Sequence, residues 1–558
     1  MTAAASPPWV DGLTIGEMLR ETARQSPDAD ALVFPQLDRR WSYAQLDADV
    51  DRVARGLLAL GVDLGSHVAV WATNWPQWVL LQFATARIGA VLVTINPAYR
   101  AFELQYVLKQ ADIDTLFLLD KFRGSDYRAM LNEAAPELAG CDPQNVQLKD
   151  FPKLRHVIAI QGEPTVGMSS WESFLKGADA VSDTELSQRE SHLNHADAIN
   201  IQYTSGTTGF PKGATLTHRN LLLNAYYIGQ CQQLTAADRI CIPVPFYHCF
   251  GCVLGVLGAA VRGAAMIIPA EHFDAEATLA AIATERATSI YGVPTMFIAQ
   301  LDHPTRSTLD FSSLRTGIMA GSPCPIEVMQ RVVDDLGARE ITIAYGLTEA
   351  SPVITQTRTD DPLELRVKTV GRPLPDVEVK IVDPATGEEL GDEQQGELCA
   401  RGHLVMLGYY QMPDATAAAI DDDGWLHSGD LAVRLPNGYY RITGRIKDMV
   451  CRGGENIYPR EIEEFLYTHP AVGDVAVVGV PDAKYVEELA VWIRLKPDAT
   501  LTEQDVQQFC RSSLAHYKVP RYVKFVTEFP QTVTGKIQKF KIRETMIAEL
   551  GLDESETA

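Results

Sequence analysis

The sequence predicts an α/β fold with a large, multi-part N-terminal domain of mostly parallel sheets, a β-rich subdomain and a small α+β domain at the C-terminal end. Strand and helix signals alternate through the first 120 residues and again after residue 213. The strands are short, unbroken apolar runs, which indicates sheets covered by helices on both faces. Near Val370 the pattern changes to short strands and turns, and a compact mixed unit follows.

The first well-marked helix follows Ser42. Ser42 and Gln45 form a capping box, and apolar residues recur at helical spacing until Gly61 ends the helix. Strands are expected at 67–71, 91–95, 113–119, 199–203, 239–243, 265–268, 289–291, 316–320 and 341–344, with helices between them, for example at 275–285. The segment 123–198 has a weaker pattern, and we expect an irregular connection there.

The C-terminal part of the sequence is predicted to form a separate unit. A β-rich stretch from Val370 to about Thr443 is followed by the charged turn 444–448. Beyond the turn, we expect a helix opened by Pro459, strands at 474–480 and 489–495, and a helix at 503–514. The predicted domains are therefore residues 1–446 and 447–558, which join at Lys447.

Composition excludes several classes of protein. The net charge of -23 argues against non-specific nucleic-acid binding, which requires clustered Lys and Arg. Nine cysteines, an odd number, and the absence of a secretory leader indicate a reducing cytoplasmic setting. The apolar run 250–261 is too short to span a membrane and ends at Arg262, so we expect a buried helix and no transmembrane segment.

The stretch Tyr203–Gly213 is the strongest candidate for a binding loop. It follows an apolar strand and contains three glycines, four Ser or Thr hydroxyls and Lys212. Glycine allows backbone N–H groups to converge on one point, and lysine supplies a positive charge suited to phosphate. The spacing is not that of a Walker A loop. The alternative is a mobile surface loop, which a lone Gly-rich stretch would favour.

Seven further stretches occur in a fixed order with this loop. They are 245–248, 320–323, 345–349, 428–430, 444–445, 453–456 and 534–537. Together they resemble the adenylate-forming superfamily of acyl-CoA synthetases, luciferases and peptide-synthetase adenylation domains. The resemblance covers about residues 13–550, and within the superfamily the chain looks most like fatty acid–CoA ligases of medium- to long-chain type.

The resemblance implies that the substrates are a carboxylic acid, ATP and coenzyme A (CoA), with Mg²⁺ as cofactor. Residues expected to bind ATP are Thr204, Ser205, Gly206, Thr207, Thr208, Gly209, Lys212, Gly321, Ser322, Tyr345, Gly346, Thr348, Asp430 and Arg445. Among them, Thr204, Ser205 and Lys212 would hold the β- and γ-phosphates. The backbone of Gly321 and Ser322, with Tyr345, would bracket the adenine, and Asp430 would accept the ribose hydroxyls. Glu349 would bind Mg²⁺, a hard ion suited to carboxylates.

The resemblance also assigns roles in the small C-terminal domain, which it implies to be mobile. Lys536 would bridge the acid carboxylate and the α-phosphate in the first half-reaction. Gly453 and Gly454 would lie in a loop presented to the CoA thiol in the second. Lys447 would be the hinge about which the domain rotates between the two steps.

The acyl group is expected near Tyr247 and His248. The resemblance places His248 beside the acyl carboxylate as a positioning residue. Gly251 and Gly255 could line a narrow acyl tunnel, but close helix packing explains the same glycines equally well. Cys249 and Cys252 form a lone CxxC pair, which we interpret as two packed, reduced thiols.

Two departures from the family pattern concern the adenine-side motif 322–325 (Ser-Pro-Cys-Pro), where many members have alanines or leucine, and Lys539, where arginine is frequent. The predicted reaction joins a fatty acid to CoA through an acyl-adenylate, releasing AMP and pyrophosphate. One alternative is an enzyme that loads an acyl group onto a separate carrier protein. Another is a non-catalytic nucleotide- or acyl-binding protein, which the intact Lys536 and Glu349 disfavour. Acyl chain length, a preference for aryl or branched acids, and oligomeric state stay open.

Overall fold

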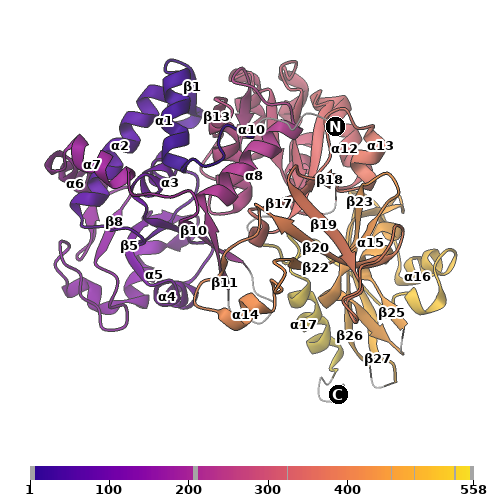
Figure 1. Ribbon diagram of the computed structural model, residues 1–558. Coiled ribbons are helices and arrows are strands. Elements are labelled where there is room, and N and C mark those ends of the chain that lie inside the picture. The colour runs from indigo at the N-terminus through magenta and orange to yellow at the C-terminus, as the bar shows by residue number, and fades with distance from the viewer. Residues whose placement is uncertain are drawn as a thin grey trace. The chain divides into compact units, whose positions relative to one another are not determined.

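The computed structural model describes residues 7–204, 211–322, 324–453, 455–482, 484–532 and 536–552 (Figure 1). Contacts divide the chain into two compact units, Met1–Glu378 with Ala400–Leu426, and Val379–Cys399 with His427–Ala558. The first unit contains two large sheets and most of the helices. The predicted domain boundary at residues 446 and 447 stays a prediction.

The first large sheet of the N-terminal unit has eight strands. Their order is β21 (Gly408–Tyr409), β11 (Lys212–Thr217), β10 (Ala198–Thr204), β4 (Val91–Thr94), β3 (His67–Trp71), β5 (Ile113–Leu118), β8 (His156–Ala159) and β9 (Ser169–Ser170). Strands β10 to β9 in this order are parallel, and β11 joins antiparallel to β10. The glycine-rich stretch therefore connects the two strands of a hairpin at the end of a parallel sheet.

The second large sheet has nine strands. Their order is β18 (Arg372–Pro373), β17 (Val353–Gln356), β16 (Glu340–Gly346), β15 (Thr316–Ala320), β14 (Ser289–Gly292), β12 (Arg239–Cys241), β13 (Ala265–Ile267), β1 (Asp30–Phe34) and β2 (Arg39–Ser42). The run from β16 to β1 is parallel, and antiparallel strands close both edges. The predicted α/β class with parallel sheets is confirmed.

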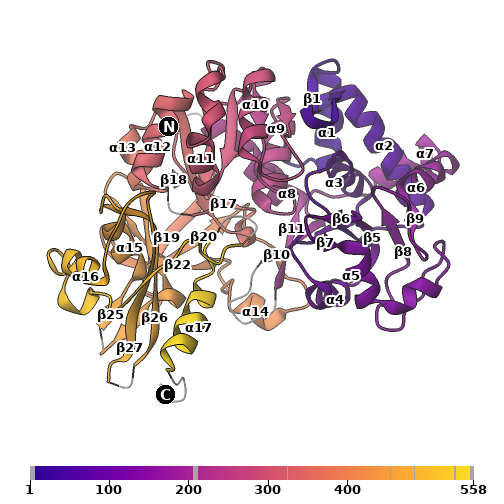
Figure 2. The same cartoon turned by 180° about the vertical axis from the view of Figure 1, so that it is seen from behind.

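Helices cover these sheets. They are α1 (Ile15–Gln25), α2 (Tyr43–Ala59), α3 (Pro76–Ile88), α4 (Ala101–Gln110), α5 (Tyr127–Ala134), α6 (Trp171–Gly177), α7 (Asp183–Glu190), α8 (His218–Cys231), α9 (Gly258–Ala260), α10 (Ala275–Thr284), α11 (Pro294–Leu301), α12 (Ile326–Leu336), α13 (Leu363–Lys368) and α14 (Pro413–Ala417). In both views, α2 and α3 lie on one side of the eight-stranded sheet and α4 and α5 on the other (Figures 1 and 2).

Both faces of the nine-stranded sheet are buried, and successive residues of its strands belong alternately to two hydrophobic clusters. Ile240, Tyr291 and Ile318 belong to one hydrophobic cluster, which they share with the eight-stranded sheet. Their neighbours Cys241, Ile290 and Met319 belong to a second cluster on α10 to α12. Successive side chains of a strand point to opposite faces, so one apolar run supplies two cores.

The expectation of an irregular connection over residues 123–198 was wrong. This segment contains α5, α6, α7 and β8, and β8 is an internal strand of the eight-stranded sheet. The elements are short, at eight residues or fewer, so each carries too few apolar repeats to stand out. A two-stranded ribbon of β6 (Lys121–Phe122) and β7 (Ser125–Asp126) precedes α5.

The C-terminal unit contains a sheet with the order β25 (Glu455–Ile457), β24 (Val450–Arg452), β27 (Val486–Leu495), β26 (Val472–Asp482), with β28 (Tyr522–Phe525) paired to β27. Its helices are α15 (Pro459–Tyr467), α16 (Glu503–Arg511) and α17 (Lys539–Leu550). Val475 and Val477 pack toward α15 and α16, whereas Ala476 and Val478 pack toward α17. The sheet is therefore covered on both faces, as Figure 1 shows for α16 and α17.

The same unit contains most of a four-stranded sheet, with the order β19 (Val377–Val382), β20 (Gln395–Gly402), β22 (Leu426–Arg434) and β23 (Tyr440–Arg445). It corresponds to the predicted β-rich stretch. Within the described part of the chain, no helix is long and apolar enough to cross a membrane. The predicted buried helix after residue 249 is present as a fully buried π-helix, η4 (Phe250–Leu257), which continues into α9. All nine cysteines are free thiols.

Candidate active site

The hairpin of β10 and β11 holds the two ends of the glycine-rich stretch together. Thr204 and Lys212 are opposite each other in the antiparallel register, and the Thr204 hydroxyl donates to the Lys212 carbonyl at 3.5 Å. The predicted residues Ser205, Gly206, Thr207, Thr208 and Gly209 lie outside the described residues. The two residues that the structure does describe, Thr204 and Lys212, are thus brought together.

Tyr409 connects Lys212 with Glu349. The Lys212 ammonium lies 5.0 Å from the centre of the Tyr409 ring, and the Tyr409 hydroxyl donates to Glu349 Oε1 at 2.7 Å. Strand β21 pairs with β11 through Ala214 and Tyr409, which fixes the tyrosine beside the hairpin. Glu349, in the 3₁₀ turn η6 (Thr348–Ala350), is 8% exposed. Burial and the Glu349 carboxylate raise the pKa of Tyr409, so its hydroxyl stays protonated and donates.

Nothing in the sequence identified Tyr409 as a candidate site residue. It lies 60 residues from Glu349, in a strand of only two residues. A two-residue strand has no periodicity, and its partner strand is distant in sequence. Only the pairing of β21 with β11 reveals that one tyrosine contacts both a candidate phosphate-binding lysine and a candidate metal-binding carboxylate.

The predicted adenine-side residues, with the predicted ATP-binding residue Gly346, lie at the ends of neighbouring parallel strands. Gly321 and Ser322 follow β15, and Tyr345 and Gly346 end β16, whose Ala344 pairs with Ala320 of β15. Ligands of open α/β sheets bind outside the carboxyl ends of the strands. Gly346 cannot be replaced without movement, because an added Cβ would lie 1.9 Å from the Pro352 carbonyl oxygen.

The predicted acyl-side residues Tyr247 and His248 directly precede Cys249, which lies beside Thr348. His248 Nδ1 accepts a hydrogen bond from the Phe250 N–H at 3.1 Å. The Sγ of the next residue, Cys249, lies 3.9 Å from the Thr348 hydroxyl. Burial raises the pKa of the Tyr247 phenol. The segment 247–249 is therefore adjacent to the candidate ATP-binding residue Thr348.

Gly251 and Gly255 lie in the π-helix η4. A Cβ on Gly251 would lie 2.3 Å from the Pro245 carbonyl oxygen, and one on Gly255 would lie 2.8 Å from the Ile242 side chain. Both glycines therefore allow close packing, the second of the two interpretations drawn from the sequence. A role in lining an acyl tunnel stays a prediction. π-Helices are frequent at functional sites, which is consistent with a substrate-binding region here.

In the C-terminal unit, Asp430 and Arg445 form an ion pair. They are opposite each other on β22 and β23, and Arg445 Nε lies 2.7 Å from Asp430 Oδ1. The Asp430 side chain is 9% exposed and that of Arg445 is 57% exposed. The guanidinium can therefore reach a ligand while it holds the carboxylate in place.

Glu397 supports the loop before Asp430, and it was not identified from the sequence. Its Oε1 accepts the Gly429 N–H at 2.9 Å, and its Oε2 lies 2.8 Å from His427 Nδ1. With Cys399, these side chains form a group that could hold a metal ion, with ligand atoms within 4.8 Å of one another. A distance of 2.8 Å is that of a charge-assisted hydrogen bond, so we assign the group to positioning Gly429 and Asp430.

Three further predicted residues of the C-terminal unit, Lys447, Gly453 and Lys536, are exposed. Lys447 lies in the 3₁₀ turn η7 (Ile446–Asp448) and Gly453 follows β24 with φ of +61°. Lys536 closes a loop with Thr532, since the Thr532 N–H donates to the Lys536 carbonyl at 2.8 Å. Gly454 lies outside the described residues. Lys539, the departure from the family pattern, pairs with Glu463 at 2.7 Å.

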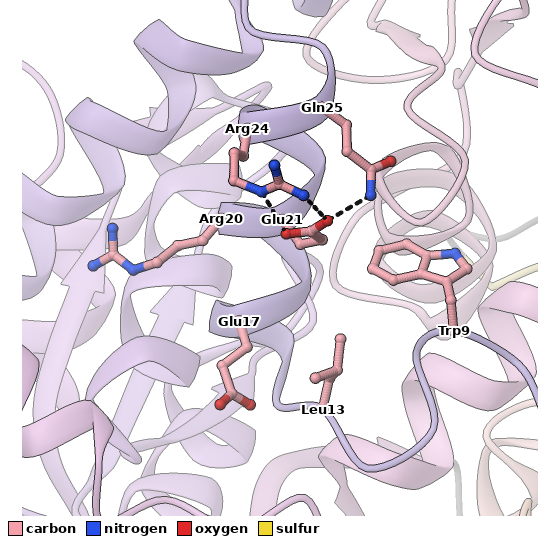
Figure 3. A pocket seen from close by; sticks show the side chains of 7 residues that line it. All are labelled: Trp9, Leu13, Glu17, Arg20, Glu21, Arg24 and Gln25. Carbon is pink, nitrogen blue, oxygen red and sulfur yellow. Dashed lines mark hydrogen bonds and ion pairs between the residues drawn. The ribbon is translucent and has the colours of Figure 1, made fainter.

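A surface hollow of about 530 Å³ beside α1 contains none of the predicted residues. Figure 3 shows that Glu21 bonds both Arg24 and Gln25 at its wall, while Trp9 and Leu13 come from the chain before the helix. The hollow shares no residue with the predicted ATP-, acyl- and CoA-binding residues, so the candidate active site lies elsewhere.

Comparison with known proteins decides the family. Residues 19–410 match the model of the AMP-binding enzymes, and residues 461–536 match the C-terminal domain of these enzymes. The chain belongs to the AMP-binding enzyme family. The predicted membership of the adenylate-forming superfamily is thereby confirmed, and the two family models match the large N-terminal and small C-terminal parts of the fold.

Several AMP-binding enzymes are similar over nearly their whole length. YngI of Bacillus subtilis strain 168, named as an acyl-CoA synthetase, is 52% identical over 543 residues, covering 97% of this chain and 99% of YngI. The mitochondrial medium-chain acyl-CoA ligase ACSF2 of Bos taurus is 41% identical, covering 97% of this chain and 88% of that protein.

Solved structures give the same result for the fold. The anthranilate CoA ligase AuaEII, in complex with anthranoyl-AMP, has a TM-score of 0.85 at 26% identity and covers 97% of this chain and 98% of that one. The Mycobacterium tuberculosis fatty acyl CoA synthetase has a TM-score of 0.72 at 28% identity and covers 96% and 99%. These findings support ATP-dependent formation of an acyl-CoA through an acyl-adenylate.

Proposed function

We propose that the protein is a fatty acid–CoA ligase that acts on medium- to long-chain acids. In the first step, a carboxylate oxygen of the acid attacks the α-phosphorus of ATP, and pyrophosphate leaves. In the second, the CoA sulfur attacks the acyl carbon of the acyl-adenylate, its thiol proton is lost, and AMP leaves with the oxygen that came from the acid.

The observation that carries this proposal is the arrangement of Lys212, Tyr409 and Glu349 at the β10–β11 hairpin. The Lys212 ammonium lies over the ring of Tyr409, and the buried Glu349 carboxylate accepts a hydrogen bond from the hydroxyl of the same tyrosine. Charge that develops on a transferring phosphoryl group is stabilised by preorganised cations and donors. Thr204 and Lys212 would hold the β- and γ-phosphates in this way.

Glu349 fits a magnesium ion. Its carboxylate is buried and hydrogen-bonded, so its orientation is fixed before any ligand binds. Mg²⁺ prefers carboxylate and phosphate oxygens, and a bound ion would neutralise phosphate charge. In the C-terminal unit, Asp430 would accept the ribose hydroxyls with Arg445 beside it, and Lys536 would compensate the α-phosphate charge.

The choice of a fatty acid is supported by the names of ACSF2 and of the M. tuberculosis synthetase. The name of AuaEII keeps an aryl acid as an alternative to be tested. Transfer to a separate carrier protein is the other alternative. We propose a cytoplasmic location, supported by the nine free thiols.

The test is CoA-dependent AMP release with a panel of short, medium, long, branched and aryl carboxylic acids, using Lys536→Ala as the matched inactive control. We expect the highest rates with medium or long straight chains, with AMP and acyl-CoA formed in equal amounts. A preference for aryl acids, or AMP release that needs a carrier protein in place of CoA, would overturn the proposal.

A further inference from the structure

The tip of the β26–β27 hairpin contacts the turn that carries Gly453. The Gly453 N–H donates to the Tyr485 carbonyl at 2.8 Å. A Cβ on Gly453 would lie 3.2 Å from Cδ1 of the Tyr485 ring, so the ring lies against the glycine. Backbone and side chain of one tyrosine thus both contact Gly453, the residue that follows β24.

Arg452 adds a second connection between the two segments. Its guanidinium lies 4.5 Å from the Tyr485 ring centre and forms a two-pronged ion pair with Glu488, at 2.5 Å and 2.8 Å. Glu488 is 1% exposed. Burying a carboxylate is unfavourable unless it is paired with a positive charge. The two parallel hydrogen bonds between a guanidinium and a carboxylate also fix the orientation of both side chains. Tyr485 is therefore held between Gly453 and Arg452.

The described residues on either side of position 483, near the tip of this hairpin, are themselves constrained. Asp482 accepts the N–H groups of Lys484 and Tyr485 at 2.9 Å each and pairs with Arg521. The next residue, Val486, has a φ of +71° and pairs with Arg452. A β-branched residue rarely adopts this conformation, and such strained positions persist where surrounding contacts impose them, often near functional sites.

We propose that Tyr485, Arg452 and Glu488 are positioning residues for thioester formation. They fix the turn at Gly453, which in the proposed function faces the CoA thiol, and they take no part in adenylation. This proposal rests on the proposed function. A misplacement of about 1 Å at a reacting group costs on the order of 10²-fold in rate, so loss of the support should act on one half-reaction.

The test measures the two half-reactions separately in Tyr485→Ala and Glu488→Gln. Adenylation is followed as acid-dependent ATP–pyrophosphate exchange, and thioester formation as single-turnover conversion of supplied acyl-adenylate with CoA. Tyr485→Phe keeps the ring and the carbonyl, and it should restore the wild-type rate. Asp474→Asn is the matched control, because Asp474 is a buried carboxylate at the opposite end of β26, paired with Arg494.

We expect thioester formation in Tyr485→Ala and Glu488→Gln to fall by about 10- to 100-fold, in the maximal rate more than in the KM for CoA, with exchange unchanged. Equal losses in both half-reactions, or the same loss in Asp474→Asn at equal melting temperature, would overturn the proposal. Wild-type protein that forms no acyl-CoA from supplied acyl-adenylate would instead contradict the proposed function.

Discussion

Tyr409 shows how a single side chain can organise the candidate phosphate site. Its ring faces Lys212 and its hydroxyl donates to Glu349. Neither contact could be predicted from the sequence, because the three residues come from three separate segments. Lys212 and Glu349 could be predicted, since each belongs to a stretch of characteristic composition, glycine-rich in one case and Tyr-Gly-Leu-Thr-Glu in the other.

Tyr409→Phe should weaken adenylation and its dependence on magnesium. The variant keeps the ring but removes the hydrogen bond that orients Glu349, and a hydrogen bond to a charged group contributes about 1.5–3 kcal/mol. We expect ATP–pyrophosphate exchange to fall about tenfold, since about 1.4 kcal/mol corresponds to tenfold, and to require more Mg²⁺ for half-maximal rate.

The neighbouring Tyr410→Phe is the control for this variant. The Tyr410 hydroxyl bonds Asp112 at 3.1 Å and makes no contact with Glu349 that the structure describes. Equal losses of exchange in Tyr409→Phe and Tyr410→Phe, or an unchanged Mg²⁺ requirement in Tyr409→Phe, would contradict the role given to Tyr409.

Val486→Gly should stabilise the C-terminal unit. A non-glycine residue in a sparsely populated backbone region costs about 1–3 kcal/mol, whereas glycine costs roughly 0.5–1 kcal/mol through its greater freedom in the unfolded chain. At φ of +71° the first effect is larger, so the free energy of unfolding in urea should rise by about 1 kcal/mol. A decrease would show that the valine side chain contributes more through packing than its backbone costs.

At the scale of elements, His218 connects two helices. It is the first residue of α8, and its Nδ1 accepts the N–H of Ile15, the first residue of α1, at 3.0 Å. The first N–H groups of a helix lack partners within the helix, so His218 satisfies one of them. Burial lowers the pKa of His218 to about 3, and the ring is therefore neutral at physiological pH.

Stability should consequently fall as the pH drops below the usual histidine pKa of about 6.5. In this range the unfolded chain binds a proton at His218 and the folded protein does not, which favours unfolding by up to about 1.4 kcal/mol per pH unit. His218→Asn retains an acceptor for the Ile15 N–H but cannot titrate. The free energy of unfolding, measured in urea, should therefore fall less steeply between about pH 6.5 and pH 4 in His218→Asn than in the wild type, by up to about 1.4 kcal/mol per pH unit. Parallel curves for the two proteins would contradict the assignment.

Elements with strong local signals could be predicted closely. The capping box at Ser42 and Gln45 is present at the start of α2, and strands β3 and β15 have the expected bounds. The elements between residues 123 and 198 could not be predicted, because they are short and because their apolar residues pack against residues distant in sequence. The π-helical form of η4 likewise depends on the packing of its glycines against Pro245 and Ile242.

At the scale of the whole molecule, the order of the motifs along the chain predicted the family. The role of Lys447 as a hinge between the two half-reactions stays a prediction. Lys447 is exposed in η7. Proline fixes φ near about −65°, whereas a hinge residue must change its backbone torsions between states. Lys447→Pro should therefore keep ATP–pyrophosphate exchange and lose acyl-CoA formation, and supplied acyl-adenylate should not rescue it.

Lys447→Ala is the control, since it removes the charge but leaves the backbone free, and it should support both half-reactions. A Lys447→Pro protein with unchanged thermal stability and both half-reactions intact would rule out a hinge at this position.

The central claim is that the acid is activated as an acyl-adenylate, and oxygen transfer tests it most directly. The acid is supplied with ¹⁸O in its carboxylate, together with ATP and CoA, and the products are analysed by mass spectrometry. The account predicts that AMP carries one oxygen from the acid, that pyrophosphate carries none and that ADP is not formed. Unlabelled AMP, or label in pyrophosphate or phosphate, would contradict it.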